Sequence, residues 1–479
     1  MEIPLYREAI ALAAALLYIL SIGFALEAII KTRTSQGAIA WAISLFAIPF
    51  IALPCYLVFG RNKFDGYLDQ RSEIEAESLR LIEQNAGAVE KYIIPTSNDT
   101  PLYTSLFNLA RMPATEGNHV DLLINGKQTF DSIMEGLESA QKYILIEFYI
   151  FRDDALGKRI GKVLADKALS GVKVHFLFDE IGSRTFPRTR LCKSLKTAGV
   201  KVAAFNTTQG RRNRFQLNFR NHRKIVVVDG KYAWIGGHNV GDEYLGLNKK
   251  IGHWRDTHTR AQGPCVLGAE IAFATDWRWA TRETLKLDWK FDGEPQGNCN
   301  ILVFPSDPAS EFEEAGLMYH QMIVDARERI WIASPYFVPD RGIIAALQLA
   351  ALRGVDVRVI IPDQPDGPFV AMANWSYTKE LLPAGVKIYR YQGGFMHQKV
   401  LLMDDYMAGV GTANFDNRSF RLNFEITLLV HDLDFARQVE LMLEQDLQSS
   451  RQVAAGEIDD KPLWFPLAMG VARLFSPVL

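Results

Sequence analysis

The stretch Asn221-His-Arg-Lys-Ile-Val-Val-Val-Asp229 decides the fold of this chain, because a second copy of its pattern follows later. That copy is Met396-His-Gln-Lys-Val-Leu-Leu-Met-Asp404, and both read His-x-Lys-x-x-x-x-Asp. In both, a glycine stands seven residues after the aspartate, and an asparagine, Asn239 or Asn414, stands ten residues after it. Chance does not produce two such matches in 479 residues with nine histidines, so we interpret them as equivalent points of a duplicated domain.

Three further pairs of similar segments precede the two motifs in the same order. They are Tyr143–Tyr149 with Ile330–Tyr336, Gly171–Asp179 with Gly354–Asp363, and Ala198–Val202 with Ala384–Ile388. Short apolar runs that alternate with amphipathic stretches are typical of α/β folds. We therefore predict two duplicated α/β domains, residues 117–292 and 293–479, packed face to face about a pseudo-twofold axis.

The spacing within each motif brings its histidine and lysine together. Side chains at positions i and i+2 of an extended strand point to the same face, so His222 projects with Lys224, and His397 with Lys399. Imidazole is a nucleophile and a proton shuttle near neutral pH, and an ammonium group neutralises phosphate oxygens without a metal ion. The two pairs therefore indicate phosphoryl chemistry in a cleft.

The motif aspartates, Asp229 and Asp404, have the opposite parity and begin turns. We expect them to position strand ends or to pair with nearby cations rather than to contact the reacting phosphorus. Metal ligation and burial in a core are the competing interpretations of the histidines. The histidines lack local metal-site spacing, and the neighbouring lysines would repel a divalent cation, so we expect no metal and no cofactor.

The first 62 residues differ in composition from the rest. The runs Ala9–Leu26 and Ala38–Phe59 carry no charge, and each is long enough to cross a hydrocarbon core of about 30 Å as a helix. We predict a transmembrane helical hairpin over residues 1–62, with its second helix bent at Pro49 and Pro54. A buried core helix and a signal peptide are the alternatives, although a signal peptide explains only one run.

A polar connector is expected over residues 63–116, with a surface helix at Tyr67–Tyr92. Lys31 and Arg33 stand in the loop of the predicted hairpin. Basic residues also stand outside the two runs, at Arg7, Arg61, Lys63 and Arg71. The positive-inside rule therefore favours a cytoplasmic catalytic portion only weakly.

The balance of charge argues against a polyanionic partner. The formal net charge is −2, and duplex binding requires an extensive basic surface, so we expect no nucleic acid to bind. A local basic run precedes the first motif, at Arg211, Arg212, Arg214 and Arg220. This run is either a solvated face or an attractor of anionic headgroups. The apolar tail Leu463–Leu479 either packs against a domain or lies in the membrane interface.

The duplicated motif, with its glycine and asparagine, resembles the phospholipase D superfamily over roughly residues 117–450. Bacterial cardiolipin synthases are similar in further features: the two apolar runs, Leu217–Gly230, Trp254-Arg-Asp256 and Ala472–Pro477. The resemblance implies membrane phospholipids as partners, no cofactor, and a bacterial inner (cytoplasmic) membrane location with cytoplasmic catalytic domains. A hydrolytic phospholipase D, a membrane-tethered nuclease and a non-catalytic scaffold are the rival functions, and the acceptor lipid and oligomeric state stay open.

The resemblance also implies residue roles. By family analogy His222 attacks the phosphorus of one phosphatidylglycerol and forms a phosphatidyl-histidine. His397 then serves as general acid and base, first for the departing glycerol and next for the hydroxyl of a second phosphatidylglycerol, which gives cardiolipin. The residues implied to bind the phosphate oxygens are Lys224, Lys399, Asn239 and Asn414.

In the family, an acidic residue after each motif orients the histidine of that motif. Glu425 matches in the second half and Asp256 in the first. Asp256 lies 17 residues after Asn239, whereas Glu425 lies 11 residues after Asn414, so the spacing departs from a strict repeat. An ordinary surface salt bridge is the alternative role for Asp256.

Overall fold

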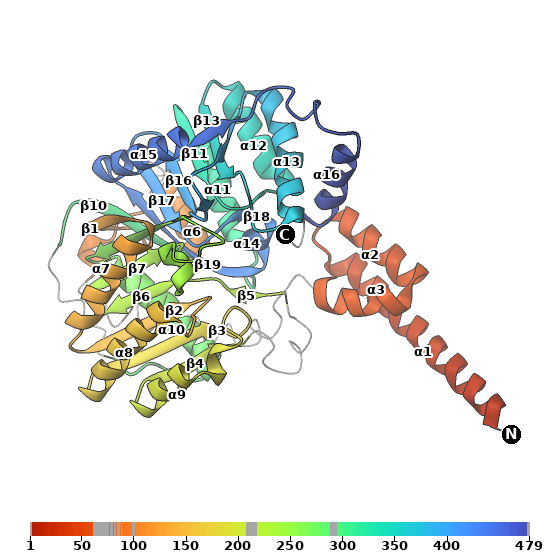
Figure 1. Ribbon diagram of the computed structural model, residues 1–479, viewed down its shortest axis with the longest axis horizontal. Helices are drawn as coiled ribbons and strands as arrows, with labels where there is room; N and C mark the ends of the chain where they lie inside the picture. The colour runs from red at the N-terminus through yellow and green to blue at the C-terminus, as the bar shows by residue number, and fades with distance from the viewer. Residues whose placement is uncertain are drawn as a thin grey trace. The chain divides into compact units, whose positions relative to one another are not determined.

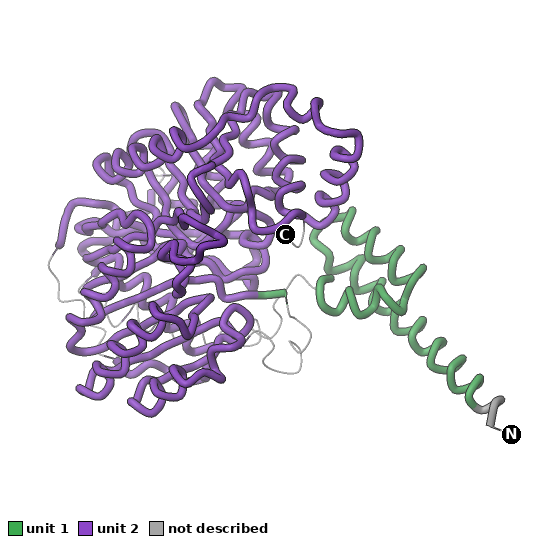
Figure 2. Tube along the Cα trace, viewed as in Figure 1, with its two compact units in different colours: residues 1–70, 207–219 green, residues 71–206, 220–479 purple. Residues whose placement is uncertain are grey.

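The computed structural model describes residues 2–60, 76, 80, 83, 87, 89–97, 101–206, 218–287 and 295–476. The chain forms two compact units, residues 1–70 with 207–219, and residues 71–206 with 220–479 (Figure 2). Both predicted halves belong to the second unit. Most of the predicted surface helix, together with Arg211, Arg212 and Arg214 of the basic run, lies outside the described residues.

The second unit is built on one mixed sheet. Its strands in the first half are β1 (Thr115–Ile124), β2 (Tyr143–Phe148), β3 (Lys173–Asp179), β4 (Lys201–Phe205), β5 (Arg220–Asn221), β6 (Ile225–Val228), β7 (Tyr232–Gly236) and β9 (Thr257–Gln262). Those in the second half are β10 (Cys299–Ser306), β11 (Arg329–Ala333), β13 (Asp356–Pro362), β14 (Lys387–Tyr391), β16 (Val400–Met403), β17 (Met407–Gly411), β19 (Asn423–His431) and β20 (Ser450–Gln452). Short strands beside it are β8 (Trp254–Arg255), β12 (Phe337–Val338), β15 (Phe395–Met396) and β18 (Phe415–Asp416).

The strand order shows the duplication directly (Figure 1). From the centre outward, one half runs β1-β9-β7-β6-β2-β3-β4 and the other runs β10-β19-β17-β16-β11-β13-β14. The outer strands pair in parallel and the inner ones antiparallel, as equivalent elements should. β1 and β10 pair antiparallel at the centre, with Thr115 opposite Ile301, so the two sheets join edge to edge. The expectation of face-to-face packing is wrong for the sheets, because joining two open edges satisfies their backbone hydrogen-bonding groups.

Helices cover both faces of the sheet. They are α6 (Pro101–Ala110), α7 (Asn125–Ser139), α8 (Ala155–Leu169), α9 (Arg190–Thr197), α10 (Val266–Thr281), α11 (Glu314–Asp325), α12 (Arg341–Leu352), α13 (Pro368–Leu381), α14 (Asn417–Arg421), α15 (Leu433–Gln448) and α16 (Trp464–Leu474). The alternation along β3 illustrates the layering. Phe176 packs against Phe151 and Phe186 on one face, while the ring of His175 contacts Trp277 of α10 on the other.

The first unit holds the two apolar runs. The first run forms a single helix, α1 (Glu2–Lys31), and Tyr6–Lys31 is the one helix in the described part of the chain whose length and composition suit a membrane crossing. The second run is not one helix: it divides into α2 (Ser35–Ala47), α3 (Pro49–Cys55) and the π-helical turn η1 (Tyr56–Gly60). Ile48 leaves the helical region because Pro49 follows it.

The prediction of a two-span hairpin is therefore only partly supported. At 1.5 Å per residue, the 13 residues of α2 extend about 20 Å, less than the ~30 Å of a hydrocarbon core. Pro54 lies inside α3, so both prolines interrupt the second run. Ala28 of α1 packs with Leu45 of α2 and with Tyr56, which gives this unit a small core of its own.

The predicted connector and tail are also structured in part. The 3₁₀ turn η2 (Glu90–Tyr92), α6 and the start of β1 fall within residues 63–116. The apolar tail forms α16, which packs Phe465 against Trp375 of α13 with ring centroids 6.0 Å apart. Leu467 and Leu474 on the same helix remain exposed.

Candidate active site

The two motifs meet at a cavity of about 1050 Å³ in the α/β unit. Its lining includes His222, His397, Asn239 and Asn414. Lys224 and Lys399 are buried, and each lies beside the histidine of its own motif. The motif side chains predicted from the sequence thus come together from both halves of the chain.

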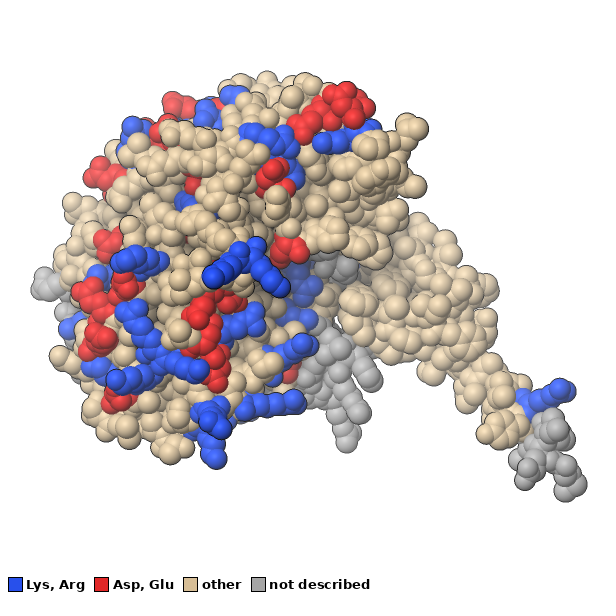
Figure 3. Space-filling view, in the orientation of Figure 1, with Lys and Arg blue, Asp and Glu red and all other residues tan. Residues whose placement is uncertain are grey.

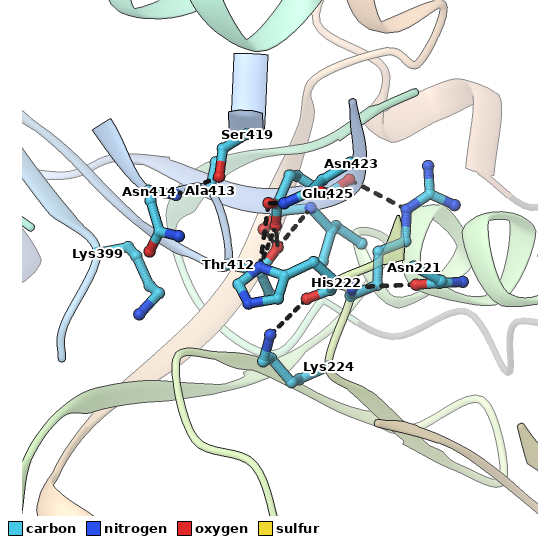
Figure 4. Close-up of polar contacts among 12 residues, drawn as sticks. Asn221, His222, Lys224, Lys399, Thr412, Ala413, Asn414, Ser419, Asn423 and Glu425 are labelled. Atoms are coloured by element: carbon cyan, nitrogen blue, oxygen red, sulfur yellow. Dashed lines mark hydrogen bonds and ion pairs between the residues drawn. The ribbon is translucent and has the colours of Figure 1, made fainter. Parts of the chain in front are cut away.

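His222 is held by a carboxylate from the second half (Figure 4). Its Nδ1 lies 3.0 and 2.9 Å from the two carboxylate oxygens of Glu425. Thr412 donates to the same carboxylate at 2.6 Å and Asn423 at 3.0 Å, so the acid is itself fixed in place. Because a carboxylate can only accept, Nδ1 carries the proton and the Nε2 lone pair is left for chemistry.

His397 is held in the same way by the first half. Its Nδ1 lies 2.8 Å from Oδ2 of Asp256. The indole of Trp254 donates to that oxygen at 3.4 Å, and the Thr257 amide donates to Oδ1 at 2.8 Å. Each acid therefore orients the histidine of the other half, whereas the family analogy assigned each to its own.

Two short strand pairings produce this exchange. β5 pairs in parallel with β19, which places Asn221 opposite Phe424. The next residues in register are His222 and Glu425. β8 pairs in parallel with β15 and places Arg255 opposite Met396. The residues that follow these two are Asp256 and His397. The backbone register thus delivers each carboxylate to its imidazole.

Burial changes the protonation of the two motif lysines. It lowers the pKa of Lys224 to about 7 and that of Lys399 to about 8, although nearby carboxylates oppose the shift. Lys224 donates to the carbonyl of His222 at 2.5 Å, and Lys399 Nζ lies 3.0–3.1 Å from both ring nitrogens of His397. An anion in the cavity would favour the charged form of both lysines.

Burial also favours the neutral form of both histidines. It lowers the pKa of His222 to about 4, against the opposing effect of Glu425. It lowers the pKa of His397 to about 3, and the charge of Lys399 adds to that decrease. Near pH 7 both imidazoles are therefore uncharged and able to act as nucleophiles or bases.

The orienting acids remain ionised. Burial alone would raise the pKa of Glu425, but His222 and Lys224 hold it below its usual range. Burial acts in the same sense on Asp256, but its interactions with His238, Lys399 and His397 outweigh burial, so its pKa also falls. An ionised acid on Nδ1 stabilises the imidazolium that forms when a histidine accepts a proton.

The two asparagines differ in how they are held. Asn239 Oδ1 accepts from the Ile150 amide at 3.0 Å, and its Nδ2 donates to the Tyr244 hydroxyl at 3.3 Å. Asn414 is buried, and among the described residues its Oδ1 has no hydrogen-bond partner. Both amides line the cavity beside the histidines, where an amide N–H can donate to a phosphate oxygen.

The motif aspartates lie away from the chemistry. Asp229 accepts from the backbone amides of Gln141, Lys142 and Tyr143 at 2.7–2.8 Å. Asp404 accepts from the amides of residues 327–329 at 2.8–3.2 Å. Each holds the start of a parallel strand and sits in the left-handed region, with φ of 55° and 52°. They position strand ends rather than contact a substrate.

Sequence reasoning missed the residue between each histidine and lysine. Arg223 points away from the cavity, pairs with the buried Asp276 at 2.8 Å, and donates to the Glu425 carbonyl at 3.0 Å. Gln398 takes the equivalent position and donates to Asp446 at 2.7 Å. The sequence did contain a signal for these two residues. Because side chains alternate along a strand, the residue between the histidine and the lysine projects to the face opposite the cavity.

The aromatic neighbours of the histidines were missed as well. The Tyr149 ring lies edge-on to His222 at 5.1 Å, and the Trp254 ring lies 5.2 Å from His397. Among the described residues, no three His, Cys, Asp or Glu side chains are grouped to hold a metal ion. The arrangement is two carboxylate–imidazole pairs with two lysines, which suits nucleophilic phosphoryl transfer.

Comparison with known proteins places the same two segments in one family. The family described as "Cardiolipin synthase, PLD-like domain" matches residues 133–262 and 319–447. Cardiolipin synthase A of Pseudomonas fluorescens is 46% identical over 470 residues, which is 97% of each chain. Cardiolipin synthase A of Pseudomonas putida is 45% identical over 467 residues, again 97% of each chain.

The fold is shared more widely than the sequence. The crystal structure of a phosphatidylserine synthase from Haemophilus influenzae matches with a TM-score of 0.60 at 15% identity. The match covers 79% of this chain and all of that one. At this identity the likeness concerns the fold alone.

The exchange of acids between halves can be tested by double-mutant cycles. Contacting residues couple by roughly 0.5–3 kcal/mol in unfolding free energy, whereas separate pairs add within about 0.5 kcal/mol. We expect His222→Ala to couple with Glu425→Gln, and His397→Ala with Asp256→Asn, but His222→Ala not to couple with Asp256→Asn. The measurement is unfolding of purified protein in detergent, with Glu457→Gln at a surface ion pair as control. If His222 coupled to Asp256 and not to Glu425, the exchanged pairing would be contradicted.

The lowered lysine pKa values predict a pH limit on activity. A lysine is cationic below its pKa, so the charge that neutralises phosphate is lost as pH rises through about 7 to 8. We expect kcat/KM to fall over that interval, and Lys224→Arg to extend the active range to higher pH because a guanidinium stays protonated. The check is a pH profile of both proteins; an identical descending limb would rule out Lys224 as its source.

Proposed function

This chain belongs to the cardiolipin synthase family, whose domains are phospholipase D-like, and we propose that its two histidines transfer a phosphatidyl group in two covalent steps. The activity is that of a phosphatidyltransferase: one phosphatidylglycerol gives its phosphatidyl group to another, and cardiolipin and glycerol form. The observation that carries the mechanism is the convergence of two carboxylate-held histidines on one cavity.

The first step makes a phosphatidyl-histidine. Nε2 of one neutral imidazole attacks the phosphorus of the donor lipid, and a P–N bond forms as the bond to the glycerol oxygen breaks. The second histidine, protonated when the anionic donor binds, gives its proton to that oxygen, so glycerol leaves neutral. The cations of Lys224 and Lys399 stabilise the charge that develops on the phosphate oxygens.

The second step reverses the roles of proton donor and acceptor. The second histidine, now neutral, takes the proton from a glycerol hydroxyl of the acceptor lipid. The hydroxyl oxygen attacks phosphorus, the P–N bond breaks, and cardiolipin is released from a free imidazole. Family analogy gives the covalent role to His222, but the two pairs are held alike, so the surroundings of each histidine must decide between them.

The N-terminal unit supports attachment to a membrane. α1 has the length and composition of a spanning helix, and the surface of this unit is uncharged over most of the face in Figure 3. We propose that α1 crosses the bilayer, whereas α2 and α3 enter and return to the same face. Exposed Leu467 and Leu474 on α16 support a further contact of the α/β unit with lipid.

The re-entrant path is supported by contacts along α1. Phe50, just after the turn at Ile48, lies edge-on to Tyr18 at 6.4 Å, near the middle of α1. Tyr56 then lies 5.9 Å from Phe24, so α3 returns toward the C-terminal end of α1. On this path Lys31 and Arg33 of the loop lie on the same membrane face as the catalytic portion, which favours a cytoplasmic catalytic portion.

The transfer reaction is tested with purified protein in mixed micelles of phosphatidylglycerol labelled in its headgroup glycerol. We expect cardiolipin and free glycerol in equal amounts, and His222→Ala and His397→Ala each to lower kcat by about 10³-fold or more. The control is His119→Ala, which removes an exposed histidine on β1. Phosphatidic acid as the main product would mean that water is the acceptor.

The membrane path is tested with single cysteines introduced at Leu5, Thr32 and Lys91 in a cysteine-free variant. We expect an impermeant maleimide to label positions 32 and 91 from the same face of sealed vesicles and position 5 from the other. A spanning hairpin would instead place 5 and 91 together and 32 opposite.

A further inference from the structure

The active-site cavity is unequal at its two ends, although the motifs that form it are duplicates. Two residues before the first motif histidine stands Arg220, but the same position in the second half is Phe395. Four residues after Asn414 stands Arg418, but the same position after Asn239 is Glu243. All four of these unequal residues line the cavity, so the inequality affects whatever binds there.

Arg220 extends the row of side chains that the motif begins. In extended backbone, Arg220 and His222 project to the same face, and the cavity lining contains both. Asn221 and Arg223 alternate with them and reach the buried carboxylate of Asp276 on the opposite side. The guanidinium of Arg220 is therefore directed to the His222 end of the cavity.

Arg418 reaches that same end from the second half. It lies on α14 and is half-buried. Burial lowers the pKa of Arg418, and the charge of Arg220 lowers it further, as expected for two like charges close together. The charges of both arginines also oppose the rise that burial causes in the pKa of Tyr149, whose ring contacts His222.

Two buried carboxylates, those of Asp179 and Asp416, lie near the arginines. Asp179 is committed to the backbone amides of Ile181 and Gly182 at 2.8 Å, and burial raises its pKa to about 6. Asp416 caps α14 through the Ser419 amide at 2.7 Å, and burial raises its pKa to about 7. Near neutral pH, burial therefore reduces the negative charge of Asp416, whereas Asp179 stays mostly ionised.

The positions equivalent to Arg220 and Arg418 carry no cation, although Lys250 also lines the cavity. Phe395 packs against Trp254 with ring centroids 4.8 Å apart and against His397 at 6.1 Å. Glu243 is paired with Arg152 at 3.0 Å, so that guanidinium is neutralised within the cavity. An apolar ring and an ion pair thus replace the two arginines.

We propose that Arg220 and Arg418 bind the phosphate of the acceptor lipid, as a second anionic subsite beside the reacting phosphorus. The inference rests on the proposed function, because only transfer to a phospholipid brings two phosphates into one cavity. The two phosphates of the product are separated by a single glycerol, so the second must lie close to one histidine. Two guanidinium groups provide paired, charge-assisted hydrogen bonds that suit a phosphate diester.

The subsite also decides between the histidines. The nucleophile and the departing oxygen lie on opposite sides of the phosphorus, and the acceptor oxygen enters on the side from which glycerol departed. An acceptor held at Arg220 and Arg418 enters beside His222. His222 is then the general acid and base, and Nε2 of His397 carries the phosphatidyl group.

The subsite is tested by comparing two acceptors. Exchange of labelled free glycerol into phosphatidylglycerol uses the same covalent step but an acceptor without phosphate. We expect Arg220→Met and Arg418→Met each to lower cardiolipin formation by about 10- to 100-fold, while glycerol exchange changes less than about threefold. Retained exchange shows that the variants fold. Lys249→Met, which removes an exposed cation, should affect neither reaction.

Three results would overturn the subsite or its foundation. Equal losses in both reactions would assign the arginines to the donor phosphate, and no loss in either would remove them from binding. A wild-type protein that performs neither reaction would instead refute the proposed function itself. Arg220→Lys should restore part of the cardiolipin synthesis, because one charged donor returns without the fork geometry.

The assignment of the nucleophile has its own test. A phosphatidyl ester of p-nitrophenol needs no acid to depart, so the covalent step can be followed without the second histidine. We expect His222→Ala to release a stoichiometric burst of p-nitrophenol and to carry the adduct on the peptide that contains His397, identified by mass spectrometry. An adduct on His222 in the wild-type protein, or a burst that survives His397→Ala, would reverse the assignment.

Discussion

The structure depends on the two short strand pairings that cross between the halves. β5 on β19 and β8 on β15 each place a carboxylate of one half against the imidazole of the other. Neither half holds a complete histidine–acid pair by itself. Two further contacts fix the register on which both pairs rely. The buried Arg223 donates to the Glu425 carbonyl, and β1 and β10 join the two halves edge to edge.

A second constraint is the burial of two lysines beside two ionised carboxylates, Asp256 and Glu425. Lys224 and Lys399 are fully enclosed and hold their protons weakly. Two neutral histidines lie beside them. A phosphodiester that enters the cavity adds negative charge beside both lysines and favours their charged form, so substrate binding itself sets the protonation that the chemistry needs.

The sequence was sufficient to predict the duplicated α/β fold, the four motif side chains and the structural part played by Asp229 and Asp404. It could not predict which acid serves which histidine, because the repeat spacing of Asp256 and Glu425 carries no information on strands that cross between halves. Nor did it predict the edge-to-edge sheet, which arises from free backbone edges rather than from side-chain pattern. The second apolar run was uniform in composition, and only the backbone break at Ile48 showed that it turns back.

The seam between β1 and β10 has an evolutionary consequence. Two identical half-length chains could join through the same edge and exchange the same acids, as a symmetric homodimer. In such an ancestor, every substitution would appear at both ends of the cavity. In a single chain that carries both halves this restriction is absent, so Arg220 can differ from Phe395 and one end can specialise for a different molecule than the other.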